Sequence, residues 1–206
     1  MALNKKGMLA GLVTALIMLA NPAAAIDFTN VAFIQTSAGT TSIPVGHLEF
    51  CQSRPAECRP HDQVVPATVL TDANWQQLVS VNNYYNQTIT PVTDEELYQV
   101  AEFWTYPNGY GDCEDFALIK RRDLIAAGWH PSTLLIAVVK EANGNGHAVL
   151  IARTDRGDLV LDNQDGAIRL WSETPYKYIK RQSQAHAGQW VDMIDDRVTV
   201  IAANMH

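Results

Sequence analysis

Three side chains of this sequence, a thiol, an imidazole and a carboxylate, have the types and order needed for nucleophilic acyl chemistry. Cys113 follows Gly109-Tyr110-Gly111-Asp112 and opens an expected helix, whose positive N-terminal end favours a thiolate. His147 begins an expected strand after a glycine-rich turn, and Asp162 ends the next expected strand. Each residue alone also has an ordinary structural explanation. Together they match a nucleophile, a base and a carboxylate that orients the base.

A hairpin argument places His147 and Asp162 together. A turn centred near residues 155 and 156 pairs residue i with a residue at about 309 − i to 311 − i of the antiparallel partner. His147 then faces residue 162, 163 or 164, depending on the register. The first and the last of these registers put Asp162 on the same face as the imidazole, whereas the middle register puts Asn163 there.

Acidic side chains surround the thiol in sequence: Asp112, Glu114 and Asp115. Carboxylates suit a helix N-terminus, but they oppose ionisation of Cys113. One carboxylate ~7 Å away at an effective dielectric of about 20 costs the thiolate ~2 kcal/mol, whereas the helix dipole returns typically ~0.3–1 kcal/mol. An imidazolium or a divalent cation can restore the balance. Because hard oxygen ligands suit calcium, these three residues are candidate Ca²⁺ ligands.

The elements that must position these side chains predict an α+β fold, with helices packed on a mostly antiparallel sheet. Capping residues and apolar spacing predict three helices: from 71–74 to about 87, from 93 along an apolar stripe to Trp104, and from 113 to about 127. Apolar β-prone runs between turns predict strands at 134–139, 147–153, 158–161, 168–171 and 176–181. Residues 71–206 are therefore expected to form the domain that carries the chemistry.

Residues 26–70 predict an irregular extension or short strands that contain the other two cysteines. Cys51 and Cys58 are expected to form a disulfide that closes a small loop. The alternative is a metal site, because His47 and His61 flank the pair. Either way, Cys113 stays free.

The first 25 residues predict export. Lys5 and Lys6 precede a short apolar run, and an Ala-x-Ala site ends at Ala25, which is typical of a secretory signal peptide comprising residues 1–25. The alternative is a transmembrane anchor, for which the run is short. We expect a periplasmic or secreted protein after cleavage near Ala25.

The composition of the 206 residues excludes other classes of protein. Hydrophobic residues make up 47% and charged residues 18%, which excludes a disordered chain. The mean hydropathy of −0.09 excludes a polytopic membrane protein. The formal net charge is −7, and no basic face is apparent, so we expect no nucleic-acid partner.

Three motifs resemble those of the bacterial transglutaminase-like cysteine proteinases, which include the LapG-type periplasmic proteases: Gly111-Asp112-Cys113-Glu114-Asp115-Phe116-Ala117, Gly146-His147-Ala148-Val149-Leu150 and Leu161-Asp162-Asn163. Weaker matches are Trp104-Thr105-Tyr106-Pro107, where the family has Trp-Ala-Thr-Pro, and Val81-Asn82 with Asn86. The resemblance extends from about residue 74 to residue 190.

This resemblance implies a papain-like core in which Cys113 attacks an acyl carbon, His147 moves the proton and Asp162 orients the imidazole. It also implies calcium at Asp112, Glu114 and Asp115. A large surface adhesin, cut at a double-alanine-type site, is the substrate that LapG-type members imply, with an inhibitory membrane receptor as a further partner. An oxyanion needs preorganised donors, for which the backbone N–H of Cys113 and the side chains of Trp104 and Asn108 are candidates.

The sequence therefore predicts an exported thiol peptidase that acts through an acyl-enzyme and needs no cofactor for the chemistry itself. Two alternatives remain open. The same three residues can pass the acyl group to an amine, as in transglutaminases, or the chain can be a non-catalytic binding module of the same fold.

Overall fold

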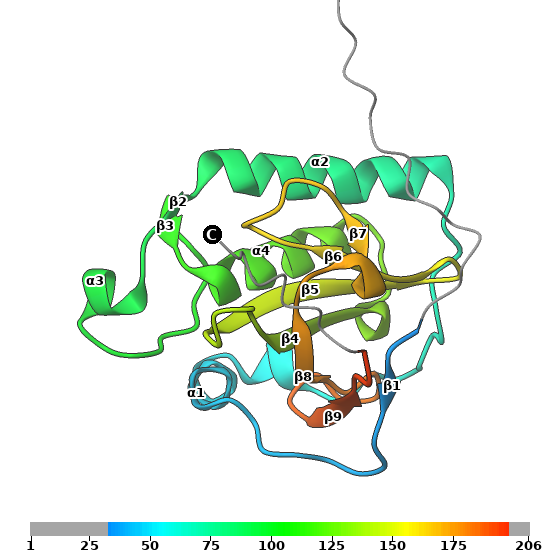
Figure 1. Ribbon diagram of the computed structural model, residues 1–206, viewed down its shortest axis with the longest axis horizontal. Helices are drawn as coiled ribbons and strands as arrows, with labels where there is room; N and C mark the ends of the chain where they lie inside the picture. Colours follow the sequence, from blue (N-terminus) through cyan, green and yellow to red (C-terminus); the bar gives the residue numbers. More distant parts are fainter. Residues whose placement is uncertain (1–32, 198–206) are drawn as a thin grey trace, which may run out of the picture.

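The computed structural model describes residues 33–197, so the expected signal peptide at 1–25 lies outside the described residues. Its main feature is a seven-stranded sheet with the order β1-β9-β8-β4-β5-β6-β7, in which every neighbouring pair is antiparallel (Figure 1). The strands are β1 (Gln35–Thr36), β4 (Leu134–Lys140), β5 (Gly146–Thr154), β6 (Gly157–Leu161), β7 (Arg169–Leu170), β8 (Lys177–Gln182) and β9 (Trp190–Ile194). A separate parallel pair joins β2 (Thr90–Pro91) to β3 (Tyr110–Gly111).

Two helices cover one face of this sheet. Helix α4 (Cys113–Ala126) lies on β4 and β5, and α2 (Asp72–Thr88) packs along α4. Shorter helices are α1 (Val45–Ser53) and α3 (Asp94–Tyr98), with 3-10 turns at Pro55–Cys58, Pro131–Thr133 and Trp171–Glu173. The α+β class, with helices on an antiparallel sheet, is confirmed.

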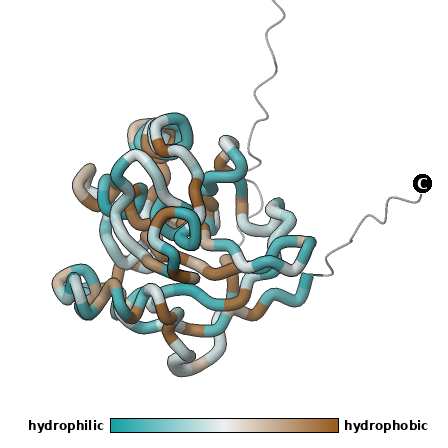
Figure 2. Tube along the Cα trace, turned by 90° about the vertical axis from the view of Figure 1, so that its left-hand side faces the viewer, coloured by the Kyte–Doolittle hydropathy of each residue, from teal (hydrophilic) through white to brown (hydrophobic). Residues whose placement is uncertain are grey.

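Both faces of the central strands are buried. In β4, Leu134 and Ile136 join the core beneath the helices, whereas Leu135, Ala137 and Val139 join the core on the opposite face. This explains why β4 appears in the sequence as an unbroken apolar run rather than an alternation of apolar and polar residues. Figure 2 shows the same arrangement, with hydrophobic segments gathered inside the chain trace.

The hairpin of β5 and β6 takes the last of the three predicted registers. Leu150 pairs with Leu161, and Thr154 pairs with Gly157. Continued along the chain, this register sets His147 opposite Gln164 and leaves Asp162 on the same face as the imidazole.

Two of the three predicted helices form nearly as expected. Helix α2 begins with a capping box in which Thr71 and Asn74 bond each other's backbone N–H groups. Helix α4 ends before Gly128, whose φ of 100° is a conformation that glycine adopts without strain.

The helix predicted to run from 93 towards Trp104 is wrong in its length. Its capping box at Thr93 and Glu96 is present, but α3 ends at Tyr98, and Gln99 has a left-handed conformation with φ of 59°. The carboxylate of Asp94 accepts a bond from Phe103 N–H and so folds the following residues back. The apolar stripe therefore belongs to a loop, and Trp104 enters the core from outside a helix.

The residues before 70 are more ordered than an irregular extension. They contain α1 and β1, and β1 pairs with β9 from the other end of the described chain. The predicted disulfide between Cys51 and Cys58 is present. Strand β9 itself was not predicted.

His47 on α1 links this disulfide to the rest of the core. Its ring is buried, Trp190 Nε1 donates to its Nδ1 at 3.0 Å, and the Cys51 sulfur lies 3.7 Å from the same nitrogen. The ring of Trp104 lies 5.2 Å from that of His47, between centroids. Burial first, and the charge of Arg121 second, lower the pKa of His47 to about 4.

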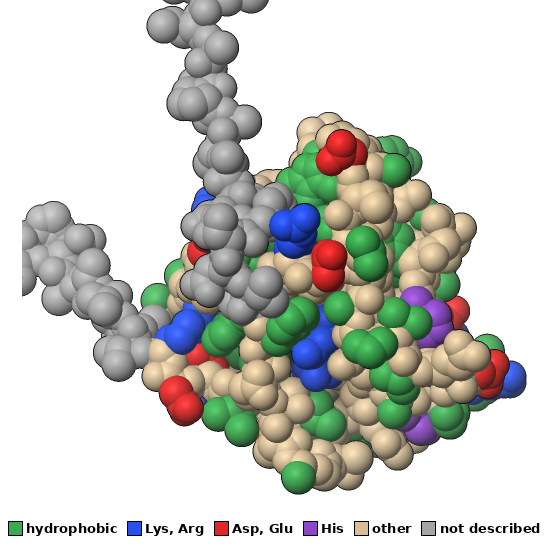
Figure 3. Space-filling view, turned by 90° about the vertical axis from the view of Figure 1, so that its right-hand side faces the viewer, with side chains coloured by type: hydrophobic (Ala, Val, Ile, Leu, Met, Phe, Trp, Pro, Cys, Tyr) green, Lys and Arg blue, Asp and Glu red, His purple; other side chains and the backbone are tan. Residues whose placement is uncertain are grey.

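The surface of the described residues carries both charge signs. Figure 3 shows one side of the molecule, on which acidic, basic and hydrophobic side chains are interspersed. Within residues 33–197, no helix has the length and apolar character to cross a membrane.

Candidate active site

The imidazole of His147 and the carboxylate of Asp162 form a buried pair. His147 Nε2 lies 2.9 Å from Asp162 Oδ1, and each residue is 4% exposed. Gln164 N donates to the same oxygen at 3.0 Å. Burial alone would raise the pKa of Asp162, but the hydrogen bonds from His147 and Tyr176 outweigh it, so the pKa is lowered. An ionised carboxylate on Nε2 leaves the other ring nitrogen, Nδ1, as the atom that can accept a proton.

The thiol of Cys113 lies beside the strand that carries His147. Ala148 N donates to the sulfur at 3.3 Å, and the thiol donates to Glu114 Oε2 at 3.1 Å. Gly111, two residues before Cys113, leaves room for the Asp115 side chain, because a Cβ at that position would lie 2.7 Å from an oxygen of Asp115. As the first residue of α4, Cys113 also has an N–H without a partner inside the helix.

Burial and acidic neighbours both oppose ionisation of the thiol, and the sequence indicated the acidic neighbours. Burial of the sulfur, then the charge of Glu114 and its hydrogen bond, raise the pKa of Cys113 well above its ordinary value. The peptide N–H of Ala148 acts in the opposite direction but is weaker. Ionisation therefore needs a proton acceptor or a compensating positive charge next to the sulfur.

Two cavities share Cys113, Gly146 and His147 in their walls. The larger, of about 440 Å³, is mainly apolar and is also lined by Val45, Trp104, Val138 and Ala148, with the charged side chains Glu102 and Lys180. The smaller, of about 260 Å³, is more polar and is also lined by Thr93, Glu96, Asp112, Asn163 and Gln164. The thiol and the imidazole thus lie where two cavities of different character meet.

The acidic residues near the thiol divide into two groups. Asp94, Asp112 and Glu114 each offer a carboxylate oxygen, and these oxygens all lie within 4.8 Å of one another. Asp115 is not in that group; its Oδ1 accepts a bond from Thr105 N at 2.8 Å, and its Oδ2 is buried without a hydrogen-bond partner. Asp94, which the sequence did not point to, thus joins two of the three predicted calcium ligands.

Burial raises the pKa values of acidic residues near the thiol. Burial, then the charge of Asp112, raises the pKa of Glu114 to about 9. Burial also raises the pKa of Asp115 to about 8, against an opposing hydrogen bond from Thr105. One oxygen each of Asp94 and Asp112 is buried without a hydrogen-bond partner. Buried, unpartnered carboxylate oxygens close together are the donor set that a hard cation takes, so the residues fit calcium.

The two predicted side-chain donors to an oxyanion differ in position. Trp104 lines the larger cavity with Cys113, but its Nε1 already donates to Glu102 at 3.1 Å. Asn108 is exposed, and the structure does not bring it to the wall of either cavity. The sequence offered both residues only as candidate side-chain donors, with no contact that placed either beside Cys113.

A network behind Asp162 was not predicted. Lys120 Nζ donates to Asn82 Oδ1 at 2.8 Å and to the Asp162 carbonyl at 3.1 Å. Asn86 Nδ2 donates to the same carbonyl at 2.8 Å. Burial lowers the pKa of Lys120 to about 7, although Asp162 opposes the shift. The sequence signal for this network was Asn82 and Asn86 following Leu78 at four-residue intervals, polar residues in line with a buried leucine.

Comparison with known proteins gives one family and several partial structural likenesses. The family described as bacterial transglutaminase-like cysteine proteinase matches residues 37–198. Calcium-bound LapG of Legionella pneumophila is 30% identical with a TM-score of 0.48, over 52% of this chain and 64% of that chain. The EGTA-treated form is 27% identical with a TM-score of 0.49, over 61% of this chain and 69% of that one. A third LapG structure from that organism is 29% identical with a TM-score of 0.49, over 57% and 68%.

The chain therefore covers less than two thirds of the first of these LapG chains. The comparison with curated proteins gives no match.

Proposed function

This chain belongs to the bacterial transglutaminase-like cysteine proteinases, and from that premise we propose that it is a thiol peptidase acting through an acyl-enzyme on Cys113. One observation carries the proposal. A buried imidazole, bonded at 2.9 Å to a carboxylate, shares two cavity walls with a free thiol. In this arrangement Cys113 is the nucleophile, His147 the base and Asp162 the group that orients the base.

The reaction proceeds in two halves. His147 Nδ1 takes the proton of the Cys113 thiol, and the sulfur attacks the carbonyl carbon of the scissile peptide bond. The imidazolium then gives that proton to the leaving nitrogen as the C–N bond breaks, which leaves a thioester on Cys113. In the second half, water gives a proton to Nδ1 and attacks the thioester, and the proton returns to the sulfur as the acid product leaves.

The two cavities support a polypeptide substrate. Because both include Cys113 and His147 in their walls, an extended chain lying across the thiol has one side in the apolar cavity and the other in the polar cavity. Hydrolysis of a peptide bond needs such space on both the acyl side and the leaving-group side. A cell-surface protein of the adhesin type is the substrate we propose from the family resemblance.

We also propose calcium as a bound cation, held by Asp94, Asp112 and Glu114. The support is the close approach of their oxygens, together with the two buried oxygens that lack partners. A cation there supplies positive charge beside the sulfur, which offsets the nearby carboxylates. The disulfide between Cys51 and Cys58 supports the proposal that the protein works outside the cytoplasm.

The central test uses the full chain and a library of quenched fluorescent peptides. We expect cleavage by the wild type, no cleavage by Cys113→Ala, and none by His147→Ala. His186→Ala is the matched control, because His186 lies in the turn between β8 and β9 and lines neither cavity; it should cleave normally. Undiminished cleavage by Cys113→Ala would refute the nucleophile.

Two further measurements separate the alternatives. Incorporation of a labelled amine into a protein substrate, without net cleavage, would favour acyl transfer over hydrolysis. For calcium, titration of chelated protein by calorimetry should show binding that Glu114→Gln weakens. The cation would be excluded if the chelated protein gave no heat of binding when calcium is added and if cleavage were unchanged after thorough EGTA treatment.

A further inference from the structure

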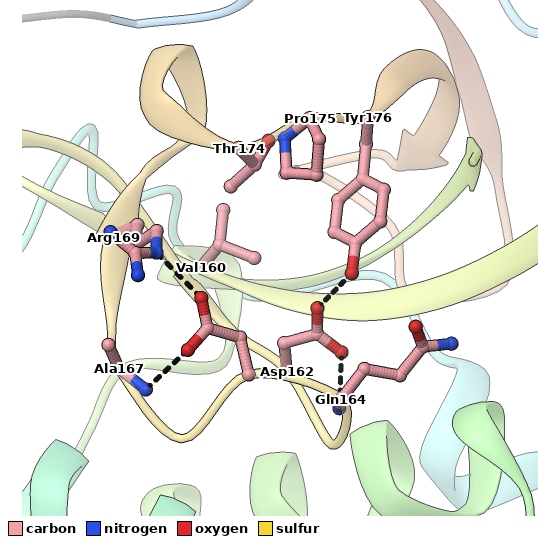
Figure 4. A pocket seen from close by; sticks show the side chains of 9 residues that line it. Val160, Asp162, Gln164, Ala167, Arg169, Thr174, Pro175 and Tyr176 are labelled. Carbon is pink, nitrogen blue, oxygen red and sulfur yellow. Dashed lines mark hydrogen bonds and ion pairs between the residues drawn. The ribbon is translucent and has the colours of Figure 1, made fainter. Parts of the chain in front are cut away.

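Tyr176 contacts both members of the buried His147 and Asp162 pair. Its hydroxyl donates to Asp162 Oδ2, as Figure 4 shows from the side of the adjoining cavity. Its ring lies 5.3 Å from the imidazole of His147, between centroids, at a tilt of 52°. The residue is 7% exposed and directly precedes β8. A single buried side chain therefore touches the carboxylate and the imidazole at once.

The hydrogen bonds of Asp162 show what the hydroxyl contributes. Oδ1 accepts hydrogen bonds from His147 Nε2, at 2.9 Å, and from Gln164 N, at 3.0 Å. Among residues 33–197, the donor that reaches Oδ2 is the Tyr176 hydroxyl. Without it, the carboxylate is held along one edge only, and rotation about its terminal torsion would misalign Oδ1 with the imidazole. Such terminal torsions are broad in energy, so an external bond is needed to fix them.

A third cavity, which does not include Cys113 or His147 in its wall, borders Asp162 and makes the bond from the Tyr176 hydroxyl more important. It encloses about 150 Å³ and is lined by Val160, Asp162, Gln164 and Tyr176 among others. In Figure 4, Tyr176 and Gln164 approach the Asp162 carboxylate from opposite sides along this wall. A cavity of this size admits water, which can compete for Oδ2. The hydroxyl occupies the position that such a water would take.

Tyr176 is itself held rigidly from the C-terminal side. Its carbonyl accepts Arg197 Nη2 at 2.6 Å, and Arg197 pairs with Asp195 at 2.8 Å. Asp195 also accepts Tyr178 N at 3.0 Å. Pro175 restricts the backbone just before the tyrosine. The backbone that carries the Tyr176 ring is therefore anchored on both sides of the residue.

We propose that Tyr176 is a positioning residue of the active site, which fixes the Asp162 carboxylate by its hydroxyl and the His147 imidazole by its ring. This inference rests on the proposed function, because it assigns Tyr176 a part in that same reaction. Tyr176 acts through Asp162 and His147 and does not touch the substrate.

The chain offers a matched control two residues away. Tyr178 is also buried, and its hydroxyl bonds Thr174 Oγ1 at 3.0 Å, a contact that involves neither Asp162 nor His147. Tyr176→Phe and Tyr178→Phe each remove one buried hydroxyl from the same strand region. A purely structural role predicts similar losses of stability and no selective effect on turnover.

We expect Tyr176→Phe to lower kcat on the order of tenfold with little change in KM, since about the energy of one hydrogen bond to the charged group is lost. Tyr178→Phe should keep the wild-type kcat. Both variants should retain stoichiometric alkylation of Cys113 by iodoacetamide. Wild-type kcat in Tyr176→Phe, or an equal fall in both variants, would overturn the inference.

A second readout keeps this inference separate from the proposed function. The proton of His147 Nε2, hydrogen bonded to Asp162, should give a downfield NMR resonance that Tyr176→Phe shifts or broadens and Tyr178→Phe does not. If the wild type cleaves no peptide, the proposed function fails, and this resonance still decides the role of Tyr176. An unchanged resonance in Tyr176→Phe would refute it.

Discussion

Acidification should turn His47 into a residue that opposes folding. The imidazole has a pKa of about 4 in the folded chain, because burial and the charge of Arg121 disfavour its protonated form, against 6.5 for the ordinary group. Between these values the imidazole takes up a proton in the unfolded chain and not in the folded chain, so the contribution of His47 to the free energy of unfolding falls as the pH falls. At ~1.4 kcal/mol per pH unit, the loss is ~2 kcal/mol at pH 5 and ~3 kcal/mol at pH 4.

The measurement is urea unfolding of the wild type and of His47→Gln at pH 7.5 and pH 5.0. Glutamine does not titrate, and its amide oxygen can accept the bond from Trp190. We expect the free energy of unfolding of the wild type, taken relative to that of the variant, to be ~2 kcal/mol lower at pH 5.0 than at pH 7.5. The comparison cancels the contributions of Glu114 and Asp115, which are the same in both proteins. Because the pKa values of these two carboxyl groups are raised in the folded chain, they stabilise the fold at low pH, and this stabilisation is lost as the pH rises.

Equal changes in the two proteins, within ~0.5 kcal/mol, would refute the reasoning, because the titrating group would then lie elsewhere. An NMR titration of the His47 ring in the wild type gives an independent check that needs no variant. A midpoint near that of an exposed histidine would show that the ring is not excluded from water in the folded protein.

Three further predictions concern the site and the segment beside it. Asp162→Asn should lower kcat by orders of magnitude in the peptide assay while the circular dichroism spectrum is unchanged, because the imidazole loses its charged partner; a change below tenfold would contradict this. Replacing Cys51 and Cys58 together by serine should lower the free energy of unfolding by ~2–3 kcal/mol, from the entropy of the closed loop, measured by urea unfolding. Gly46→Ala should lower the melting temperature and raise KM, because a Cβ would lie 2.3 Å from the ring of Trp104, which lines the apolar cavity. An unaltered melting curve and KM would show that the indole moves aside freely.

Local sequence signals predicted the parts of the fold that local physics decides. The turn near residues 155 and 156 limited the hairpin to three registers, and two of these put Asp162 on the same face as His147. The choice among those registers needed the packing of both sheet faces. Helix α4 was predictable because its apolar residues and the Gly128 that follows it lie close together in the chain, although the Asp112 side chain, expected to cap the helix, makes no capping bond.

The remainder depended on contacts between distant residues. Tyr176 reaches Asp162 from the segment that precedes β8, and Asp94 reaches Asp112 across the β2 and β3 pair. No spacing in the sequence indicates either contact. The length of α3 was overestimated because an apolar stripe at helical spacing cannot be told from a loop that buries one tryptophan.

The pairing of β1 with β9 has a consequence for any shortened version of this protein. A fragment that begins at residue 71 would keep Cys113, His147 and Asp162 but lose the strand that covers β9. The bare N–H and C=O groups of β9 would then be open to strands from other molecules, a common start of aggregation. It would also lose Val45, which lines the apolar cavity. Expression work should therefore retain the residues from β1 onward as an integral part of the folding unit.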